Sequence, residues 1–282
     1  MKTKMPTLSE ASNLVYKRRY NGEDSAENFL IAMKYNIKAL GNLPVNKITK
    51  QHIKKLMDYH RFTRKNSKQV TNTKVGYLKT VLDEMIEDGF IQDVSFPKRL
   101  KDKRQKVHYL TDDMEKDLLD NLYSKQNPNT WMAADIIKCL IDLGCRVNEL
   151  LNLEKRFVDF DNNQINFNDR KNDQAVAVPM TNRVRDILTN YCYEIKDFDK
   201  LFSLNYSELN AIWQKARKDL GYADKKFYTI HLCRHTCASR LVQRGVPILL
   251  VKDWLGHEDI ENTMIYAHLA PKALHSVVEV LN

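Results

Sequence analysis

The stretch that decides the fold of this chain lies in its last thirty residues and runs Leu255-Gly256-His257-Glu258-Asp259-Ile260-Glu261-Asn262-Thr263-Met264-Ile265-Tyr266-Ala267-His268-Leu269. It predicts the end of one helix, a turn and a second short helix that carries Tyr266, with His257 nine positions earlier. A phenol has a pKa of about 10. Tyr266 can therefore act as a nucleophile near neutral pH only if the fold places a base or strong positive charge beside it.

The composition predicts a two-domain protein of the cytoplasm. The chain has 282 residues, of which 43% are hydrophobic, enough for two ordinary cores. No apolar run approaches the roughly 18–20 residues of a membrane span, so we expect a soluble protein with no membrane partner. The five cysteines are odd in number and contain no Cys-x-x-Cys pair, as expected of reduced thiols in the cytoplasm.

The positive charge is confined to the first third of the chain. Residues 1–107 contain 23 Lys and Arg against 11 Asp and Glu, a net charge of +12, whereas the remainder carries 22 against 25, a net charge of −3. A basic module beside a nearly neutral one is typical of a protein that follows a nucleic acid backbone. A basic surface kept for solubility is the alternative.

Spacing and breaker residues predict the domain boundaries. Residues 1–96 read as a domain of four short helices, with basic side chains and tyrosines on their polar faces. The basic run 97–107 has no helical period and is predicted to be an interdomain linker. Residues 108–282 form a second domain, in which three short alternating runs between residues 157 and 179 predict a small antiparallel sheet among helices. The predicted fold is mainly α with that one sheet.

Three boxes of this second domain resemble those of the tyrosine recombinase family, also called the phage integrase family. Gly144-Cys145-Arg146-Val147-Asn148-Glu149-Leu150-Leu151-Asn152-Leu153 is similar to the family's Gly-x-Arg-x-x-Glu-Leu-x-x-Leu. The second box is His231-x-x-Arg234-His235-Thr236, and the third is the stretch from Leu255 to His268. Lys171, in a turn eight residues before a Val-Pro pair, resembles the family's hairpin lysine. Boxes in this order at ordinary distances are a specific signal.

The resemblance implies a core-binding domain at residues 1–96 and a catalytic domain of α+β type at residues 108–282. It implies that Tyr266 attacks a phosphodiester and forms a 3′-phosphotyrosyl link. The other implied site residues are Arg146 and Arg234 as a clamp on the phosphate, Lys171 as the acid for the departing oxygen, His231 in proton transfer and His257 on the phosphate. The covalent link stores the bond energy, so no cofactor or metal is expected. Glu149 is expected to anchor Arg146 or a helix start, and His235 is expected to be structural.

The resemblance also implies partners. Family members act on double-stranded DNA as homotetramers, and some recruit host or phage accessory factors that bend DNA or set direction. Residues 271–281 have helical apolar spacing, and in the family such a tail docks on a neighbouring protomer. We therefore expect an integrase of a phage or other mobile element, associated with the nucleoid in the cytoplasm.

Several alternatives stay open at this point. A chromosome-dimer resolvase of the Xer type shares the chemistry, a type IB topoisomerase would only nick and relax DNA, and a DNA-binding regulator would bind without cutting. A zinc site is a further alternative, because His231, Cys233, His235 and Cys237 lie within seven residues. On a helix only the residues four apart share a face, which leaves two ligands where a structural zinc site needs four.

Overall fold

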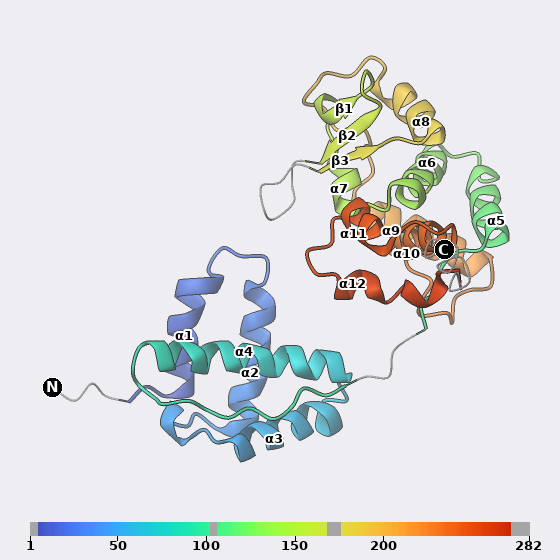
Figure 1. Cartoon of the computed structure of the whole chain (residues 1–282). Helices are drawn as coiled ribbons and strands as arrows, with labels where there is room; N and C mark the ends of the chain where they lie inside the picture. The colour runs from blue at the N-terminus through green and yellow to red at the C-terminus, as the bar shows by residue number, and fades with distance from the viewer. Residues whose placement is uncertain (1–4, 102–105, 168–175, 272–282) are drawn as a thin grey trace, which may run out of the picture. The chain divides into compact units, whose positions relative to one another are not determined.

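The computed structural model describes residues 5–101, 106–167 and 176–271. The chain divides into two compact units, Met1–Gln105 and Lys106–Asn282 (Figure 1). Lys171 and the predicted docking tail after Pro271 lie outside the described residues. Among the described helices, none is long and apolar enough to cross a membrane.

The described part of unit 1 consists of four α-helices: α1 (Leu8–Val15), α2 (Ala26–Leu40), α3 (Lys50–Asp58) and α4 (Lys68–Glu87). Helices α1 and α3 each continue into one π-helical turn. Side-chain oxygens of Thr7, Thr49 and Ser67 accept the backbone N–H three residues on and so start α1, α3 and α4. Helix α4 crosses α1 and α2 and packs against both, which gives unit 1 its apolar core (Figure 1).

A polar group lies inside that core. The His60 ring is fully buried, its Nε2 lies 2.8 Å from Asn36 Oδ1, and its Nδ1 lies 3.3 Å from Asn66 Nδ2. The Asn36 amide also donates to the carbonyl of Lys74 at 2.9 Å. Burial lowers the pKa of His60 to about 4, with the charges of Lys74 and Arg64 adding to the effect. His60 is therefore a neutral hydrogen-bonding link between α2, the turn after α3, and α4.

The first residues of the basic run after α4 are attached to unit 1. The amide of Asn72 on α4 exchanges two hydrogen bonds with the backbone of Leu100, at 2.9 and 3.0 Å. Lys68 donates from Nζ to the carbonyl of Lys101 at 2.9 Å. Residues 97–101 thus run along α4 as part of the unit.

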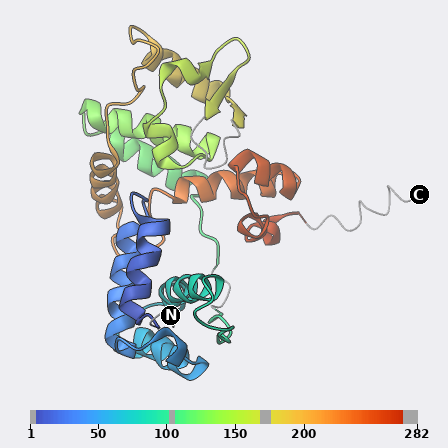
Figure 2. The same cartoon turned by 90° about the vertical axis from the view of Figure 1, so that its left-hand side faces the viewer.

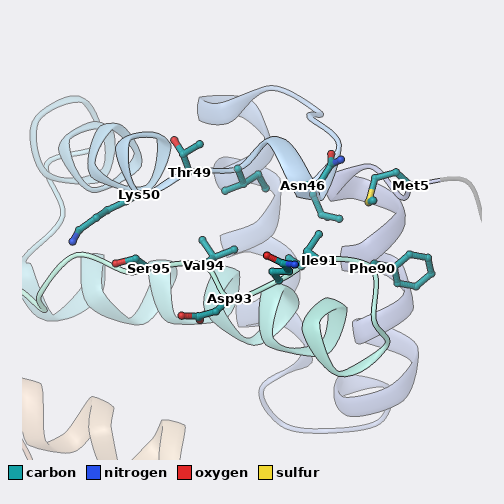
Figure 3. A pocket seen from close by; sticks show the side chains of 12 residues that line it. Met5, Asn46, Thr49, Lys50, Phe90, Ile91, Asp93, Val94 and Ser95 are labelled. Carbon is teal, nitrogen blue, oxygen red and sulfur yellow. The ribbon is translucent and has the colours of Figure 1, made fainter.

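A cavity of about 460 Å³ opens on unit 1 between the segment Val45–Lys50 and the segment Phe90–Ser95 (Figure 3). Its lining mixes apolar residues such as Ile91 with polar ones such as Thr49. None of the candidate catalytic residues lines it.

Unit 2 is built around α6 (Pro128–Leu143), whose residues face core on nearly every side. Helix α6 begins at Pro128, because Asn127 caps it and proline is well suited to a first helical position. The helices packed against α6 are α5 (Asp112–Tyr123), α7 (Val147–Leu151), α8 (Asn182–Cys192), α9 (Tyr206–Asp219) and α10 (Leu232–Gln243).

The sheet of unit 2 has the strand order β1-β2-β3 and is antiparallel throughout. The strands are β1 (Val158–Asp159), β2 (Gln164–Phe167) and β3 (Val176–Pro179). Ile165 on β2 pairs with Val178 on β3, and both side chains are buried. The sequence-based prediction of a mainly helical chain with one small antiparallel sheet is confirmed.

The opening stretch forms the last described part of unit 2. Helix α11 (Ile248–Leu255) ends at Gly256 in the left-handed conformation, α12 (Glu261–Met264) follows, and Tyr266 stands just before a 3-10 turn, Ala267–Leu269. Figures 1 and 2 both show α11 and α12 beside α10, against which α11 packs. This arrangement brings the third sequence box next to the second.

Candidate active site

The first arginine of the site is placed by a sharp helix end. Gly144 ends α6 with φ +62°, and the chain turns directly into α7, with Arg146 as its N-cap. A Cβ on Gly144 would lie 2.8 Å from Cys237 Sγ and 2.8 Å from Leu255 Cδ2, so the position requires glycine for space as well as for conformation. The chain that follows the turn is thereby held close to α10 and α11.

Glu149 fixes the half-exposed side chain of Arg146. Its carboxylate accepts one hydrogen bond from the Arg146 backbone N–H and one from Arg146 Nη1, both at 2.7 Å. The anchoring role expected for Glu149 is confirmed. Arg146 presents its guanidinium at the start of α7.

The second arginine is buried. Arg234, on the first turn of α10, is 4% exposed and donates from Nη1 to the carbonyl of Gly144 at 2.7 Å and from Nη2 to the carbonyl of Leu255 at 2.9 Å. Both acceptors are neutral groups, which leaves the positive charge available to an anion. Burial, together with the nearby charge of Arg146, lowers the pKa of Arg234. Two guanidinium groups thus gather at one place, that of Arg146 paired with Glu149 and that of Arg234 bonded to neutral carbonyls.

Two histidines belong to the same cluster. Burial and the charges of Arg234 and Arg146 lower the pKa of His231, and they lower that of His257 to about 4. The His257 ring is held by a hydrogen bond of 2.8 Å between its Nδ1 and the hydroxyl of Thr263, which is fully buried. The two rings are therefore neutral near pH 7 and lie within the field of both arginines.

Tyr266 is 2% exposed and lies in a small apolar cluster with Val107, Ala238, Val251 and Leu255. Burial raises its pKa to about 12, and the charge of Arg234 opposes this effect. Its hydroxyl oxygen lies 2.6 Å from Nδ1 of His235. Tyr266 is thus both a core residue and the bearer of a hydroxyl aimed at the cluster of basic groups.

The structure brings together five of the six residues singled out by the sequence, namely Arg146, His231, Arg234, His257 and Tyr266. The sixth, Lys171, lies outside the described residues. The sequence reasoning assigned no function to His235 or to Thr263, although both stand inside the quoted boxes. In the described part of the chain, no group of three or more His, Cys, Asp or Glu side chains is arranged to hold a metal ion.

This geometry agrees with what comparison to known proteins shows. Residues 108–273 match the model of the phage integrase family. The chain belongs to the phage integrase family. It is 35% identical to tyrosine recombinase XerA of Saccharolobus solfataricus over 134 residues, which is 48% of this chain and 45% of that protein. It is 28% identical to the integrase of Haemophilus phage HP1, with 85% of this chain and 70% of that protein covered.

Solved structures of this family share the fold. The Tn1549 transposon integrase in complex with a circular intermediate DNA superposes with a TM-score of 0.79 at 17% identity, covering 98% of this chain and 99% of that one. The XerH site-specific recombinase bound to difH substrate superposes with a TM-score of 0.70 at 19% identity, covering 98% and 85%. The alignment with XerA spans less than half of that relative's length.

Proposed function

We propose that this protein is a site-specific DNA recombinase that cuts and rejoins double-stranded DNA through a 3′-phosphotyrosyl intermediate. The observation that supports this most is that Tyr266 lies within the field of Arg234, whose guanidinium donates to two neutral carbonyls. Attack on a phosphodiester adds negative charge to the non-bridging oxygens, and fixed guanidinium groups stabilise that charge best where water is excluded. Arg146 and Arg234 are the clamp in this proposal.

The remaining roles follow from the same reaction. Tyr266 forms the bond to phosphorus, and the bond from phosphorus to the 5′-oxygen breaks. Lys171 protonates that departing oxygen, and His257, oriented by Thr263, donates to the phosphate. The phosphotyrosyl bond keeps the energy of the broken phosphodiester, so rejoining needs no nucleotide cofactor, and no step assigns work to a metal.

Unit 1 supplies DNA binding in this proposal. Its helices expose Lys54 and Lys55 on α3 and Arg64 in the turn that follows, where the Arg64 guanidinium lies 3.9 Å from the centre of the Tyr35 ring. Lysine and arginine on such a surface bind phosphates without reading sequence. In this proposal a tetramer of the chain would hold two DNA sites.

The biological role we propose is integration and excision of a phage or other mobile element. The Xer-type resolvase shares every catalytic step and differs in its target.

Deleting the residues after Pro271 should weaken assembly on paired sites while DNA binding by one protomer persists. Unchanged recombination by that truncated chain would refute a docking role for the tail.

A nicked suicide substrate, from which the 5′ side diffuses away, tests the chemistry. The wild-type protein should form a covalent protein–DNA adduct in the presence of EDTA. Tyr266→Phe should bind the same DNA with unchanged affinity and form no adduct. An adduct of the Phe variant, or the absence of one from the wild type on its own target site, would refute the proposal.

A further inference from the structure

Among the described residues of the candidate site, His235 is the one whose side chain hydrogen-bonds the hydroxyl of Tyr266. Its Nδ1 lies 2.6 Å from the tyrosine hydroxyl oxygen, within the range expected for a nucleophile and its base. Sequence reasoning expected this histidine to be structural and His231 to assist proton transfer. In the structure the His231 ring meets the edge of the His235 ring, with centroids 4.9 Å apart and planes at 88°.

The position of His235 is set by a rigid element. It follows Arg234 directly on the first turn of α10, and the next residue, Thr236, is fully buried. The Thr236 hydroxyl accepts from the backbone N–H of Leu110 at 2.9 Å, which fastens this turn to the chain that precedes α5. The His235 ring and the Arg234 guanidinium are therefore fixed relative to each other, and a phosphate held by Arg234 would lie close to the Tyr266 hydroxyl.

The groups around His235 keep it in the form that accepts a proton. Burial lowers its pKa to about 4, and the neighbouring charges that act in the same direction come from His231, Arg234 and His108. The Tyr266 phenol is protonated, because burial raises its pKa. A DNA phosphate between the two arginines would offset their positive charge and so favour an imidazolium at this position.

We propose that His235 is the general base of the reaction and takes the phenolic proton of Tyr266 as the tyrosine attacks. This inference rests on the proposed function. In cleavage, the Tyr266 oxygen bonds to phosphorus, its proton moves to His235 Nδ1, the bond to the 5′-oxygen breaks, and that oxygen receives a proton from Lys171. In rejoining, the 5′-hydroxyl gives its proton back to Lys171 as it attacks phosphorus, the bond from phosphorus to the Tyr266 oxygen breaks, and the imidazolium returns its proton to the departing phenolate.

The variant His235→Asn isolates proton transfer from positioning. The asparagine Oδ1 stands near the place of Nδ1 and can accept the hydroxyl's hydrogen bond, but an amide does not take up the proton. We expect DNA binding within threefold of wild type and single-turnover cleavage of the suicide substrate slowed by about 10²–10⁴-fold. The slow rate should rise about tenfold per pH unit as hydroxide replaces the base. His268→Asn is the matched control, because His268 is exposed and its Nδ1 binds the carbonyl of Ile265.

A substrate whose 5′-bridging oxygen is replaced by sulfur separates base from acid. A thiolate leaves without being protonated, so this substrate should restore cleavage by Lys171→Ala and should not restore cleavage by His235→Asn. Equal rescue of both variants would place His235 on the leaving-group side and overturn the inference. Cleavage by His235→Asn at or above one third of the wild-type rate would also overturn it, since the histidine would then merely hold the tyrosine.

The outcomes of these tests remain distinct from those of the proposed function. Failure of the wild type to form any adduct refutes the recombinase proposal, whereas a normal wild-type adduct with fast His235→Asn cleavage refutes only the role of His235. If His235→Asn loses DNA binding or unfolds, His235→Ala with added imidazole replaces it. Cleavage that rises with imidazole concentration supports the base, and a lack of rescue in folded, DNA-bound protein overturns it.

Discussion

Gly144 lies so close to Cys237 that a Cβ on the glycine would stand 2.8 Å from the cysteine Sγ. The same Cβ would also meet Leu255, and the backbone at Gly144 has φ +62°. One residue therefore fixes both the end of α6 and the approach of α10 and α11 to the turn that carries Arg146. Any side chain at this position should therefore lower the free energy of unfolding.

Gly144→Ala should lower the free energy of unfolding by about 2–4 kcal/mol, because it combines left-handed strain with a steric clash in a packed core. Gly245→Ala is the matched control, since Gly245 has φ +80° and nothing lies within 4 Å of its added Cβ. The control should cost about 1 kcal/mol, from strain alone. Urea unfolding of both variants measures the difference, and equal losses would show that the contact with Cys237 carries no energy.

Arg234→Lys should reduce the rate of covalent adduct formation by at least about 100-fold. A lysine keeps the positive charge, but its single ammonium nitrogen lacks the planar fork with which the guanidinium reaches both carbonyls and a phosphate. Binding of target DNA should change by less than about threefold, because most affinity comes from the many other phosphate contacts. Gel-shift and suicide-substrate assays on one preparation measure the two quantities. A parallel loss of both would mean that Arg234 acts in binding.

Thr263→Val should slow cleavage by about tenfold and leave DNA affinity unchanged. Valine has nearly the same shape, but it removes the hydroxyl that holds His257 Nδ1 at 2.8 Å. His257→Ala should be slower still, and adding Thr263→Val to it should have no further effect. Additive losses in this double-mutant cycle would show that Thr263 acts independently of His257.

Acid should destabilise the protein through its buried neutral histidines. The pKa values of His60, His235 and His257 are lowered to about 4 in the folded chain, so between pH 6.5 and 4 the unfolded chain binds more protons. The full stability is thus present above pH 6.5 and is lost as the pH falls toward 4, by about 1–2 kcal/mol per histidine near pH 5. Scanning calorimetry at pH 7.5 and 5.0 measures the loss.

His60→Gln measures how much of this loss of stability at low pH comes from unit 1. The glutamine amide can replace the His60 Nε2 contact with Asn36 but does not titrate. The loss of stability between pH 7.5 and 5.0 should therefore be smaller in this variant than in wild type. An identical loss would mean that His60 is not protonated on unfolding in this range.

The basic side chains of unit 1 should differ in their effect on DNA affinity. Arg18 donates to Asp88 at 2.8 Å and to the buried carboxylate of Glu84 at 3.1 Å, and Arg19 also pairs with Glu84. Arg18→Ala should mainly lower stability. The double change Lys54→Ala and Lys55→Ala should mainly lower affinity and reduce the slope of log K against log salt by about 1–2. Binding measured across salt concentrations tests the contrast.

Much of the fold could be read from the sequence because its signals are local. The helices of unit 1 and the sheet of unit 2 follow from hydrophobic spacing, from caps such as Thr49, and from breaks such as Gly41. The start of α6 is also a local signal, because Asn127 caps the helix and Pro128 occupies its first position. The fold class and the family required nothing beyond these patterns and the three boxes.

The sequence around a residue does not show which distant side chain will contact it in the folded protein. Tyr266 and His235 are 31 residues apart, and their hydrogen bond exists because α10 and the turn after α12 pack together. His231 and His235 look equivalent in the sequence, one helical turn apart, and only packing decides which ring meets the hydroxyl. The role of Thr263 is also set by packing, since its hydroxyl can orient His257 only where the histidine ring points toward it.

Arg234 also makes the chain's readiness to cut DNA depend on its having folded. Its two donors are satisfied only when the last carbonyls of α6 and α11 converge on it, from Gly144 and Leu255. A chain in which either helix end has not formed lacks a rigid phosphate clamp, even if it already grips DNA through unit 1. Under the proposed function, an incompletely folded copy could therefore bind DNA without cleaving it, because the bonds that hold Arg234 in place are tertiary contacts.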